Sequence, residues 1–338
     1  MSDTPVGVWL LRRCVLAPGV IALTAFLWVT LPLWLLVAAA LSPLLPGKWR
    51  ALRLGWLVVF YMTLESLGLL VLLGWWVASG FGARMRSAYF EGLHYDLVQG
   101  VLWVLFREAK RVLKLSIETA GPTPDAMPGQ PLLVACRHAG PGDSLTLIHA
   151  LMHDYRREPR IVLKDTLQWE PFFDVVLTRI PARFISPARG TDLEATVGDL
   201  ARDLDENDAF VIFPEGGNFT PERRERAIAK LRQLGLERMA QRAEEMIHVL
   251  APRPGGLLAA LDAAPEADVL LVAHTGLDHV LTVADVWREL PMDKRIIMRW
   301  WRVPRAEIPT GRDERIEWLF DWWERIDDWV DENRPEPL

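Results

Sequence analysis

The chain has 338 residues, of which 51% are hydrophobic and 24% are charged, so its length allows one large domain or two small ones. Its formal net charge of −6 leaves no basic field over the whole protein, which argues against nucleic acid as a partner. The two cysteines, Cys14 and Cys136, lie far apart and indicate neither a disulfide framework nor a zinc site.

Two long apolar runs dominate residues 1–83. Residues 14–47 contain no charged side chain, and Glu65 is the only charged residue in 54–83. A helix needs about 20 apolar residues to span the core of a bilayer, so each run is long enough. Basic residues precede, separate and follow the runs, and tryptophans lie near their ends, where aromatic rings favour the membrane interface. The sequence therefore predicts a membrane helical hairpin that anchors the protein.

Two alternatives to this hairpin are less consistent with the sequence. A signal peptide has an apolar region of roughly 7–15 residues, whereas this first run is more than twice as long and a second run follows. The other alternative is a buried pair of helices in a soluble protein. Whether the hairpin crosses the bilayer or enters one leaflet stays open, because Pro32 favours a kink and the basic turn at 48–53 fits poorly outside. Glu65 is expected to face the paired helix or the soluble domain, since a carboxylate in lipid is costly.

Residues 84–120 are expected to form an amphipathic linker helix. Leucine and valine side chains recur there at helical spacing, which predicts a helix over 87–118. The same stretch carries a basic band made of Arg107, Lys110, Arg111 and Lys114. The band is either a solvated face or a contact with anionic lipid headgroups, and the sequence leaves both open.

In residues 121–311, short apolar runs alternate with helical stretches after a turn-rich linker at 121–131. Strands are predicted at 132–136, 160–163, 182–185, 209–213, 269–273 and 295–298. Helices are predicted near 144–155, 192–206, 221–247 and 255–263. The alternation indicates an α/β domain with a mixed, partly parallel sheet flanked by helices. Residues 312–338 are expected to form a C-terminal amphipathic helix whose tryptophan stripe packs onto this domain.

The stretch RHAGPGDSLT, residues 137–146, contains two possible motifs. The letters GDSL resemble a serine-esterase signature with Ser144 as nucleophile. Such an esterase also needs an aspartate three residues before a late histidine, and none of the seven histidines has one. Four letters arise easily by chance, so Ser144 is better explained as the N-cap of the following helix.

The second motif pairs His138 with Asp143. His138 follows a predicted strand, and the Gly140-Pro141-Gly142 turn can bring Asp143 back to it. Asp143 would then hold one ring nitrogen, while the other takes a proton from a hydroxyl group. In that chemistry the substrate's own alcohol attacks, and no protein nucleophile is required.

A further motif lies about seventy residues on, where a predicted strand ends in Phe213-Pro214-Glu215-Gly216. With His138 and Asp143, it resembles the glycerolipid acyltransferases, the 1-acylglycerol-3-phosphate acyltransferase-like family. Two further blocks of that family are similar to stretches of this chain, in family order. One is matched loosely by Lys164, Leu167, Pro171, Phe172, Phe184, Ile185 and Arg189, and the other by residues 248–256. The resemblance covers roughly residues 85–325.

The resemblance implies that His138 is the catalytic base and that Asp143 orients it. It implies a set of substrate-binding residues, namely Glu215, Gly216, Gly217, Asn218, Arg137, Lys164, Arg189 and Arg253. Two positions depart from the family pattern. Arg137 stands where an asparagine is common, and Gly217-Asn218 replaces a Thr-Arg pair whose arginine is thought to bind the acceptor phosphate. Arg137, Arg189, Arg223 or Arg224 could compensate for the lost charge.

By this resemblance, the protein moves a fatty acyl group from acyl-CoA or acyl-carrier protein to the hydroxyl of a lysolipid. The expected acceptor is 1-acyl-glycerol-3-phosphate, which would give phosphatidic acid. Alternatives are another lysophospholipid, a phosphate-free acceptor, or a non-catalytic lipid-binding protein. Neither a cofactor nor a metal is expected. Membrane lipid is the expected partner, in the inner (cytoplasmic) membrane, with the catalytic domain on the cytoplasmic side.

Overall fold

The computed structural model describes residues 5–45, 49–121, 129–140, 142–185, 193–278, 280 and 282–334. Its internal contacts divide the chain into two compact units that are interleaved along the sequence. The first unit comprises residues 1–115, 162–191 and 283–293, and the second comprises residues 116–161, 192–282 and 294–338. The domain boundaries expected from the sequence stay a prediction.

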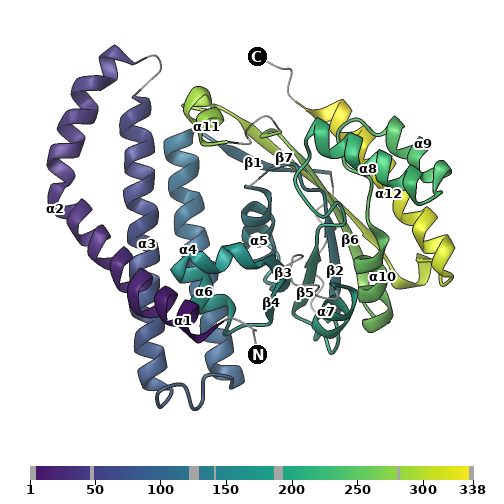
Figure 1. Cartoon of the computed structure of the whole chain (residues 1–338), viewed down its shortest axis with the longest axis horizontal. Helices are drawn as coiled ribbons and strands as arrows, with labels where there is room; N and C mark the ends of the chain where they lie inside the picture. The colour runs from purple at the N-terminus through teal and green to yellow at the C-terminus, as the bar shows by residue number, and fades with distance from the viewer. Residues whose placement is uncertain are drawn as a thin grey trace. The chain divides into compact units, whose positions relative to one another are not determined.

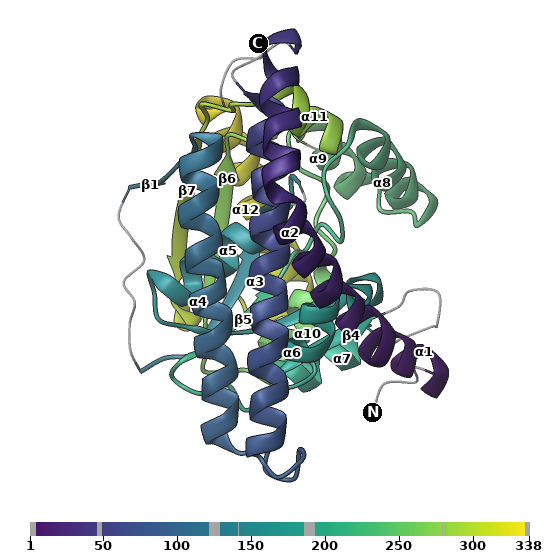
Figure 2. The ribbon, with the colours of Figure 1, turned by 90° about the vertical axis from the view of Figure 1, so that its left-hand side faces the viewer.

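The first unit is built on long helices, which Figures 1 and 2 show running in alternating directions. The chain is helical from Val6 to Leu44, through α1 (Val6–Leu10), a π-helical segment (Leu11–Leu16), α2 (Ala17–Leu41) and a 3₁₀ turn (Ser42–Leu44). It continues in α3 (Arg50–Ala78) and α4 (Ala88–Leu113). By length and composition, Val6–Leu44 and Arg50–Ala78 could each cross a membrane, a test that signal sequences and soluble core helices also pass.

The two apolar helices differ in how much of their surface is covered. Helix α2 continues through Pro32 and leaves apolar side chains such as Val29 and Leu36 exposed. Helix α3 buries Leu69 and Leu72 against Phe172 and its neighbours. The close approach depends on Gly68 in α3, where an added Cβ would lie 2.5 Å from the ring of Phe172.

Glu65, in the middle of α3, is buried. It lies beside Glu170 and hydrogen-bonds to it, while the hydroxyl of Tyr61 donates to Glu170 at 2.5 Å. Glu170 also caps α6 (Pro171–Leu177) by accepting the amide of Phe173 at 2.7 Å. The carboxyl group of Glu65 is therefore directed at a protein partner, as expected.

Some elements of the first unit differ from the sequence-based expectation. The helix predicted over 87–118 ends at Leu113, because Lys114 adopts a left-handed conformation with φ of 57°. Its last residues instead form a strand, β1 (Ser116–Ala120), in the second unit. Two short helices, α6 and α11 (Val283–Glu289), were not predicted, since seven residues give too little periodicity to detect.

The sheet has seven strands in the order β1-β7-β6-β2-β5-β3-β4. Their bounds are β2 (Leu132–Cys136), β3 (Glu158–Lys164), β4 (Ala182–Ile185), β5 (Asp208–Ile212), β6 (Asp268–Thr275) and β7 (Arg295–Val303). The pairs β1–β7, β2–β5, β2–β6 and β3–β5 are parallel, whereas β6–β7 is antiparallel. The predicted mixed, partly parallel α/β sheet is confirmed. Strand β4 and the end of β3 belong to the first unit.

Helices flank the part of the sheet that lies in the second unit (Figure 1). Helix α5 (Asp143–His153) covers one face, and α10 (Pro254–Ala263) and α12 (Arg312–Asn333) cover the other. The remaining helices are α7 (Leu193–Leu200), α8 (Pro221–Gln233) and α9 (Glu237–Glu245). The single helix predicted over 221–247 is thus two helices, and Gly235 between them has a φ of +73° that a continuing helix could not accommodate.

The C-terminal helix packs as its pattern predicts. Trp323 in α12 is completely buried, together with Leu319 and Ile326. The acidic face of α12 meets Arg242 of α9, which binds Glu317, Asp321 and Glu324. The charge of Arg242 therefore compensates the negative charge of these carboxylates, which lie on the face of α12 that is turned away from the core.

Candidate active site

The loop between β2 and α5 brings His138 and Asp143 together. Every residue of β2 is buried, and the chain leaves the strand at its carboxyl end, where ligands bind in open α/β sheets. Nδ1 of His138 lies 3.5 Å from Oδ2 of Asp143. The amide of Gly140 donates to the same oxygen at 2.5 Å, so the turn itself fixes the carboxylate.

The expectation that Ser144 caps α5 is wrong. The helix begins at Asp143, and Gly142 occupies the N-cap position. Asp143 therefore lies in the first helical turn, where the positive end of the helix dipole favours a negative charge. This position helps to keep the carboxylate ionised beside the histidine.

The surroundings of the pair favour a charged Asp143 and an accessible imidazole. Burial alone would raise the pKa of Asp143, but His274, the hydrogen bond to His138 and the Gly140 amide outweigh it, so the pKa is lowered. The side chain of His138 is 15% exposed and its ring packs beside Phe213, with 4.6 Å between ring centroids. Because Nδ1 faces Asp143, Nε2 is the nitrogen left to take a proton from a substrate.

Glu215 lies after β5 and is 1% exposed. Its Oε1 accepts the amide of His138 at 2.9 Å, and its Oε2 accepts the amide of Leu250 at 3.0 Å. Burial raises the pKa of Glu215 to about 8, although the two amides and the charge of Arg137 act in the opposite direction. The carboxyl group thus connects the backbone of His138 to the loop before α10.

Gly216, Gly217, Asn218 and Arg253 lie around one turn. Gly216 has a φ of +70°, and a Cβ added there would lie 3.1 Å from the guanidinium of Arg253. The amide of Arg253 donates to the carbonyl of Pro214 at 2.8 Å, which fixes the arginine beside the turn. A side chain at position 216 would therefore be strained and would displace a cation.

Arg223 supplies a second cation to the same turn. Its Nη1 donates to the carbonyl oxygen of Asn218 at 3.0 Å and would lie 3.0 Å from a Cβ added at Gly217. Arg224, by contrast, donates to the carbonyls of Met246 and Glu244, each at 2.6 Å. Of the two arginines considered at the start of α8, Arg223 is the one that contacts this turn.

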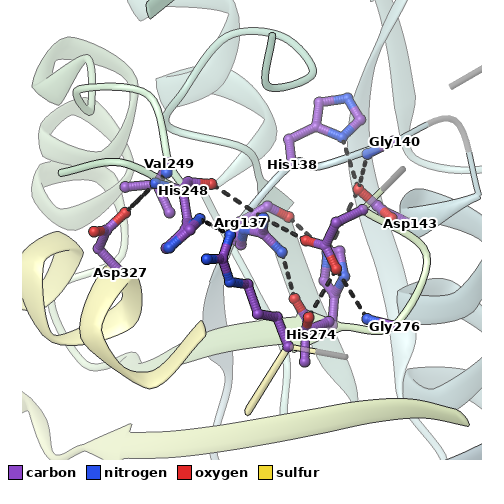
Figure 3. Close-up of polar contacts among 12 residues, drawn as sticks. Arg137, His138, Gly140, Asp143, His248, Val249, His274, Gly276 and Asp327 are labelled. Atoms are coloured by element: carbon purple, nitrogen blue, oxygen red, sulfur yellow. Dashed lines mark hydrogen bonds and ion pairs between the residues drawn. The ribbon is translucent and has the colours of Figure 1, made fainter. Parts of the chain in front are cut away.

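Arg137 is 2% exposed and its guanidinium is surrounded by protein groups (Figure 3). It forms an ion pair with Asp278 at 2.6 Å and donates to the carbonyl oxygens of His274 and His248, at 2.5 and 3.0 Å. The guanidinium of Arg137 is therefore bound by protein groups, and it supports the backbone at His248 and His274. The predicted contact of Arg137 with substrate stays a prediction.

Two predicted site residues, Lys164 and Arg189, remain. Lys164, the last residue of β3, is exposed and belongs to the first unit. Arg189 lies outside the described residues. Among the described residues of the second unit, the structure therefore gathers His138, Asp143 and Glu215 with the glycine turn and its arginines.

Sequence reasoning missed two buried groups, one beside the predicted pair and one that binds the loop before α10. His274, in β6, places Nε2 3.5 Å from Oδ2 of Asp143. Asp327, in α12, accepts the amides of Ile247, His248 and Val249. The sequence held one signal for His274, a histidine at the end of the apolar run VLLVAHT. Parallel strands end at the same edge of a sheet, so a residue at the end of this run can lie beside the residues that follow β2.

Within the described ranges, no group of three or more histidine, cysteine, aspartate or glutamate side chains could hold a metal ion.

The comparison with protein families agrees with the resemblance expected from the sequence. Residues 116–252 match the family model described as Acyltransferase, a segment that contains His138, Asp143 and Glu215. No curated protein matches the chain. The crystal structure of the 1-acyl-sn-glycerophosphate (LPA) acyltransferase PlsC from Thermotoga maritima is similar at 12% identity and a TM-score of 0.46, over 79% of this chain and 98% of that chain.

Proposed function

Because residues 116–252 belong to the acyltransferase family, we propose that the protein transfers a fatty acyl group from an acyl thioester to the free hydroxyl of a lysolipid. The observation that carries the proposal is the accessible imidazole of His138, whose Nδ1 faces the buried carboxylate of Asp143. A histidine oriented in this way is suited to general base catalysis near neutral pH.

The proposed reaction needs one proton carrier. Nε2 of His138 takes the proton of the acceptor hydroxyl as its oxygen attacks the carbonyl carbon of the thioester. Asp143 stabilises the imidazolium that forms and keeps the ring in one orientation. The tetrahedral intermediate then collapses, the C–S bond breaks, and His138 returns the proton to the departing thiolate. The products are an ester and a free thiol, with no covalent bond to the protein.

We further propose that the acceptor carries a phosphate and that 1-acyl-glycerol-3-phosphate is converted to phosphatidic acid. Support comes from Arg223 and Arg253, which flank the turn of Gly216, Gly217 and Asn218. Arginine can bind a phosphate group with two parallel hydrogen bonds. The donor would be acyl-CoA or acyl-carrier protein, acting as a co-substrate.

The proposed reaction takes place at a membrane, with the catalytic domain on the cytoplasmic side of the inner membrane. The two long apolar helices support this location, because a lysolipid and a long acyl chain both reside in or near the bilayer. An enzyme anchored there meets both substrates at high local concentration.

The test is acyl transfer from labelled oleoyl-CoA to a panel of lysolipids, with His138→Ala compared with the unmodified chain. Loss of a general base should lower kcat by about 10²–10⁴-fold. His153→Ala is the matched control, because this exposed histidine lies on α5 with Asp143 and should leave the rate unchanged. Full transfer by His138→Ala would contradict the proposal. Transfer only to phosphate-free acceptors would keep the chemistry and exclude phosphatidic acid as the product.

A further inference from the structure

The carboxylate of Asp143 lies between two histidines, of which the proposed reaction uses only His138 (Figure 3). Oδ2 of Asp143 is 3.5 Å from Nδ1 of His138 and also 3.5 Å from Nε2 of His274. His274 is 6% exposed, so this second imidazole lies within the protein, behind the site.

The hydrogen bonds of His274 determine which ring nitrogen carries a proton. Nε2 lies 3.1 Å from the carbonyl oxygen of Arg137. A carbonyl can only accept a hydrogen bond, so Nε2 must be the donor. The N–H that donates to this carbonyl also lies 3.5 Å from Oδ2 of Asp143. The amide of Gly140 donates to the same carboxylate oxygen.

The position of His274 is fixed by the sheet and by Arg137. Strands β2 and β6 are parallel, and the amide of Arg137 donates to the carbonyl of Val272 at 3.0 Å, which extends the pairing beyond β2. The guanidinium of Arg137 donates to the carbonyl of His274 at 2.5 Å and forms an ion pair with Asp278. Backbone and side chain of His274 are thus both bound to Arg137, which leaves the imidazole little freedom to turn.

We propose that His274 is a positioning residue of the acyl-transfer reaction, whose Nε2–H holds the carboxylate of Asp143 against the imidazole of His138. This inference rests on the proposed role of His138 as the base. His274 acts through Asp143 and does not contact the substrate. Arg137 takes part by holding His274, which gives a function to the arginine that departs from the family pattern.

The charges around His274 set the direction of the expected effect. Asp143 faces it from α5, Arg137 from the end of β2, and Asp278 from the loop after β6. Because His274 holds Asp143 beside His138, its removal lets the carboxylate move away, and Asp143 then stabilises the protonated form of His138 less. The acidic limb of the profile of kcat/KM against pH should therefore move to lower pH.

The test compares His274→Ala with His274→Gln in the full chain, purified in detergent. Glutamine keeps an N–H donor near the position of Nε2, whereas alanine removes it. A 1 Å displacement of a catalytic group can cost roughly a hundredfold in rate. We expect His274→Ala to lower kcat by roughly ten- to a hundredfold, with little change in KM and with the shifted limb. His274→Gln should recover most of the rate and the original limb.

Two kinetic outcomes would overturn the inference. One is a rate and pH profile of His274→Ala that match those of the unmodified chain. The other is an equal loss in both variants with no movement of the acidic limb, which would indicate a purely structural role.

A second measurement separates this inference from the proposed function. Nitrogen NMR of histidine-labelled protein reports which ring nitrogen of His138 carries the proton, and the spectrum of His138→Gln identifies its signals. If the unmodified chain transfers no acyl group, the proposed function fails while this readout still applies. Loss of the Nδ1–H form of His138 in His274→Ala, and its return in His274→Gln, would support the positioning role. An unchanged signal in His274→Ala would overturn it.

Discussion

Glu215 is a buried acid whose two oxygens are both occupied by backbone amides, those of His138 and Leu250. A carboxyl group buried in the protein is costly to ionise, and burial raises the pKa of Glu215 to about 8. The residue therefore has a structural task, to join two loops, and its ionisation is linked to the stability of the fold.

The first prediction concerns the pH dependence that Glu215 imposes on stability. Between its ordinary pKa of 4.5 and about 8, the unfolded chain loses a proton that the folded chain keeps. The free energy of unfolding should then fall as pH rises, by at most about 1.4 kcal/mol per pH unit. Glu215→Gln cannot titrate, so its melting temperature should approach or overtake that of the unmodified chain as the pH increases through this window.

Thermal unfolding in detergent at several pH values measures this effect. Glu225→Gln is the control, because Glu225 is exposed on α8, and its curve should run parallel to that of the unmodified chain. A constant difference in melting temperature between Glu215→Gln and the unmodified chain would show that Glu215 does not titrate in this range.

The second prediction concerns Arg223. A hydrogen bond to a charged group contributes about 1.5–3 kcal/mol, so Arg223→Ala should raise KM for a phosphate-bearing lysolipid by roughly tenfold or more and change kcat less. Arg226→Ala is the matched control, because Arg226 is exposed one turn further along α8 and donates to the carbonyl of Glu222. Steady-state kinetics with lysophosphatidate would measure both variants. An equal KM in the two would remove Arg223 from the proposed phosphate contact.

At the scale of elements, the loop before α10 depends on the C-terminal helix. Asp327 in α12 is buried and accepts the amides of Ile247, His248 and Val249, at 3.0, 2.6 and 3.0 Å. The next amide along the chain, that of Leu250, binds Glu215. A helix outside the segment of family similarity therefore holds a loop that contacts the site.

The third prediction follows from this arrangement. Asp327→Ala should leave three buried amides without an acceptor and lower the free energy of unfolding by about 1–3 kcal/mol for each amide that water cannot reach. The rate of acyl transfer should fall with it, because the loop no longer holds Glu215. Asp328→Ala, at the exposed neighbouring position, should change neither the melting temperature nor the rate. A normal rate in a destabilised Asp327→Ala protein would separate the loop from catalysis.

The elements that could be predicted are those with a repeated local pattern. The central strands are continuous apolar runs, and α12 repeats its tryptophans and leucines at helical spacing. Strand β1 was missed because its sequence, SIETA, continues the periodicity of α4, and its strand character comes from pairing with β7. Its secondary structure is therefore decided by a partner far away in the sequence, which no local pattern can reveal.

The site residues that could be predicted are likewise those that lie in a local motif. His138, Asp143 and Glu215 lie in short motifs with a recognisable order, so the sequence was sufficient to single them out. His274 and Asp327 have no such motif. They join the site through the register of β6 beside β2 and through the packing of α12, and both depend on contacts between distant segments.

At the scale of the whole molecule, the apolar surface of α2 requires an explanation. Val29 is 81% exposed and Leu36 is 69% exposed, in a helix that carries no charged residue. Exposure of such an apolar surface to water is unfavourable, and contact between α2 and lipid would explain why these side chains are not covered by protein. The basic residues beside the apolar helices fit the same location.

The fourth prediction tests this location. A charged residue near the centre of a membrane helix costs about 2.5–3.5 kcal/mol, so Val29→Asp with Leu36→Asp should release the protein from membranes or prevent its accumulation there. The apolar pair Val29→Leu with Leu36→Ile is the control and should fractionate like the unmodified chain. Extraction of cell membranes with alkaline carbonate measures the difference. Retention of the aspartate variant in the pellet would mean that α2 does not lie in lipid.

The dependence of the site on α12 also bears on how the protein is made. The ribosome synthesises His138, Asp143 and Glu215 well before Asp327, whose carboxylate fixes the loop next to Glu215. A nascent chain that has just completed α10 therefore holds the motif residues without the helix that secures them. We expect such a chain to be inactive and to gain acyl transfer only when α12 has been translated and has docked. Active transfer by chains stalled on the ribosome after α10 would refute this order of events.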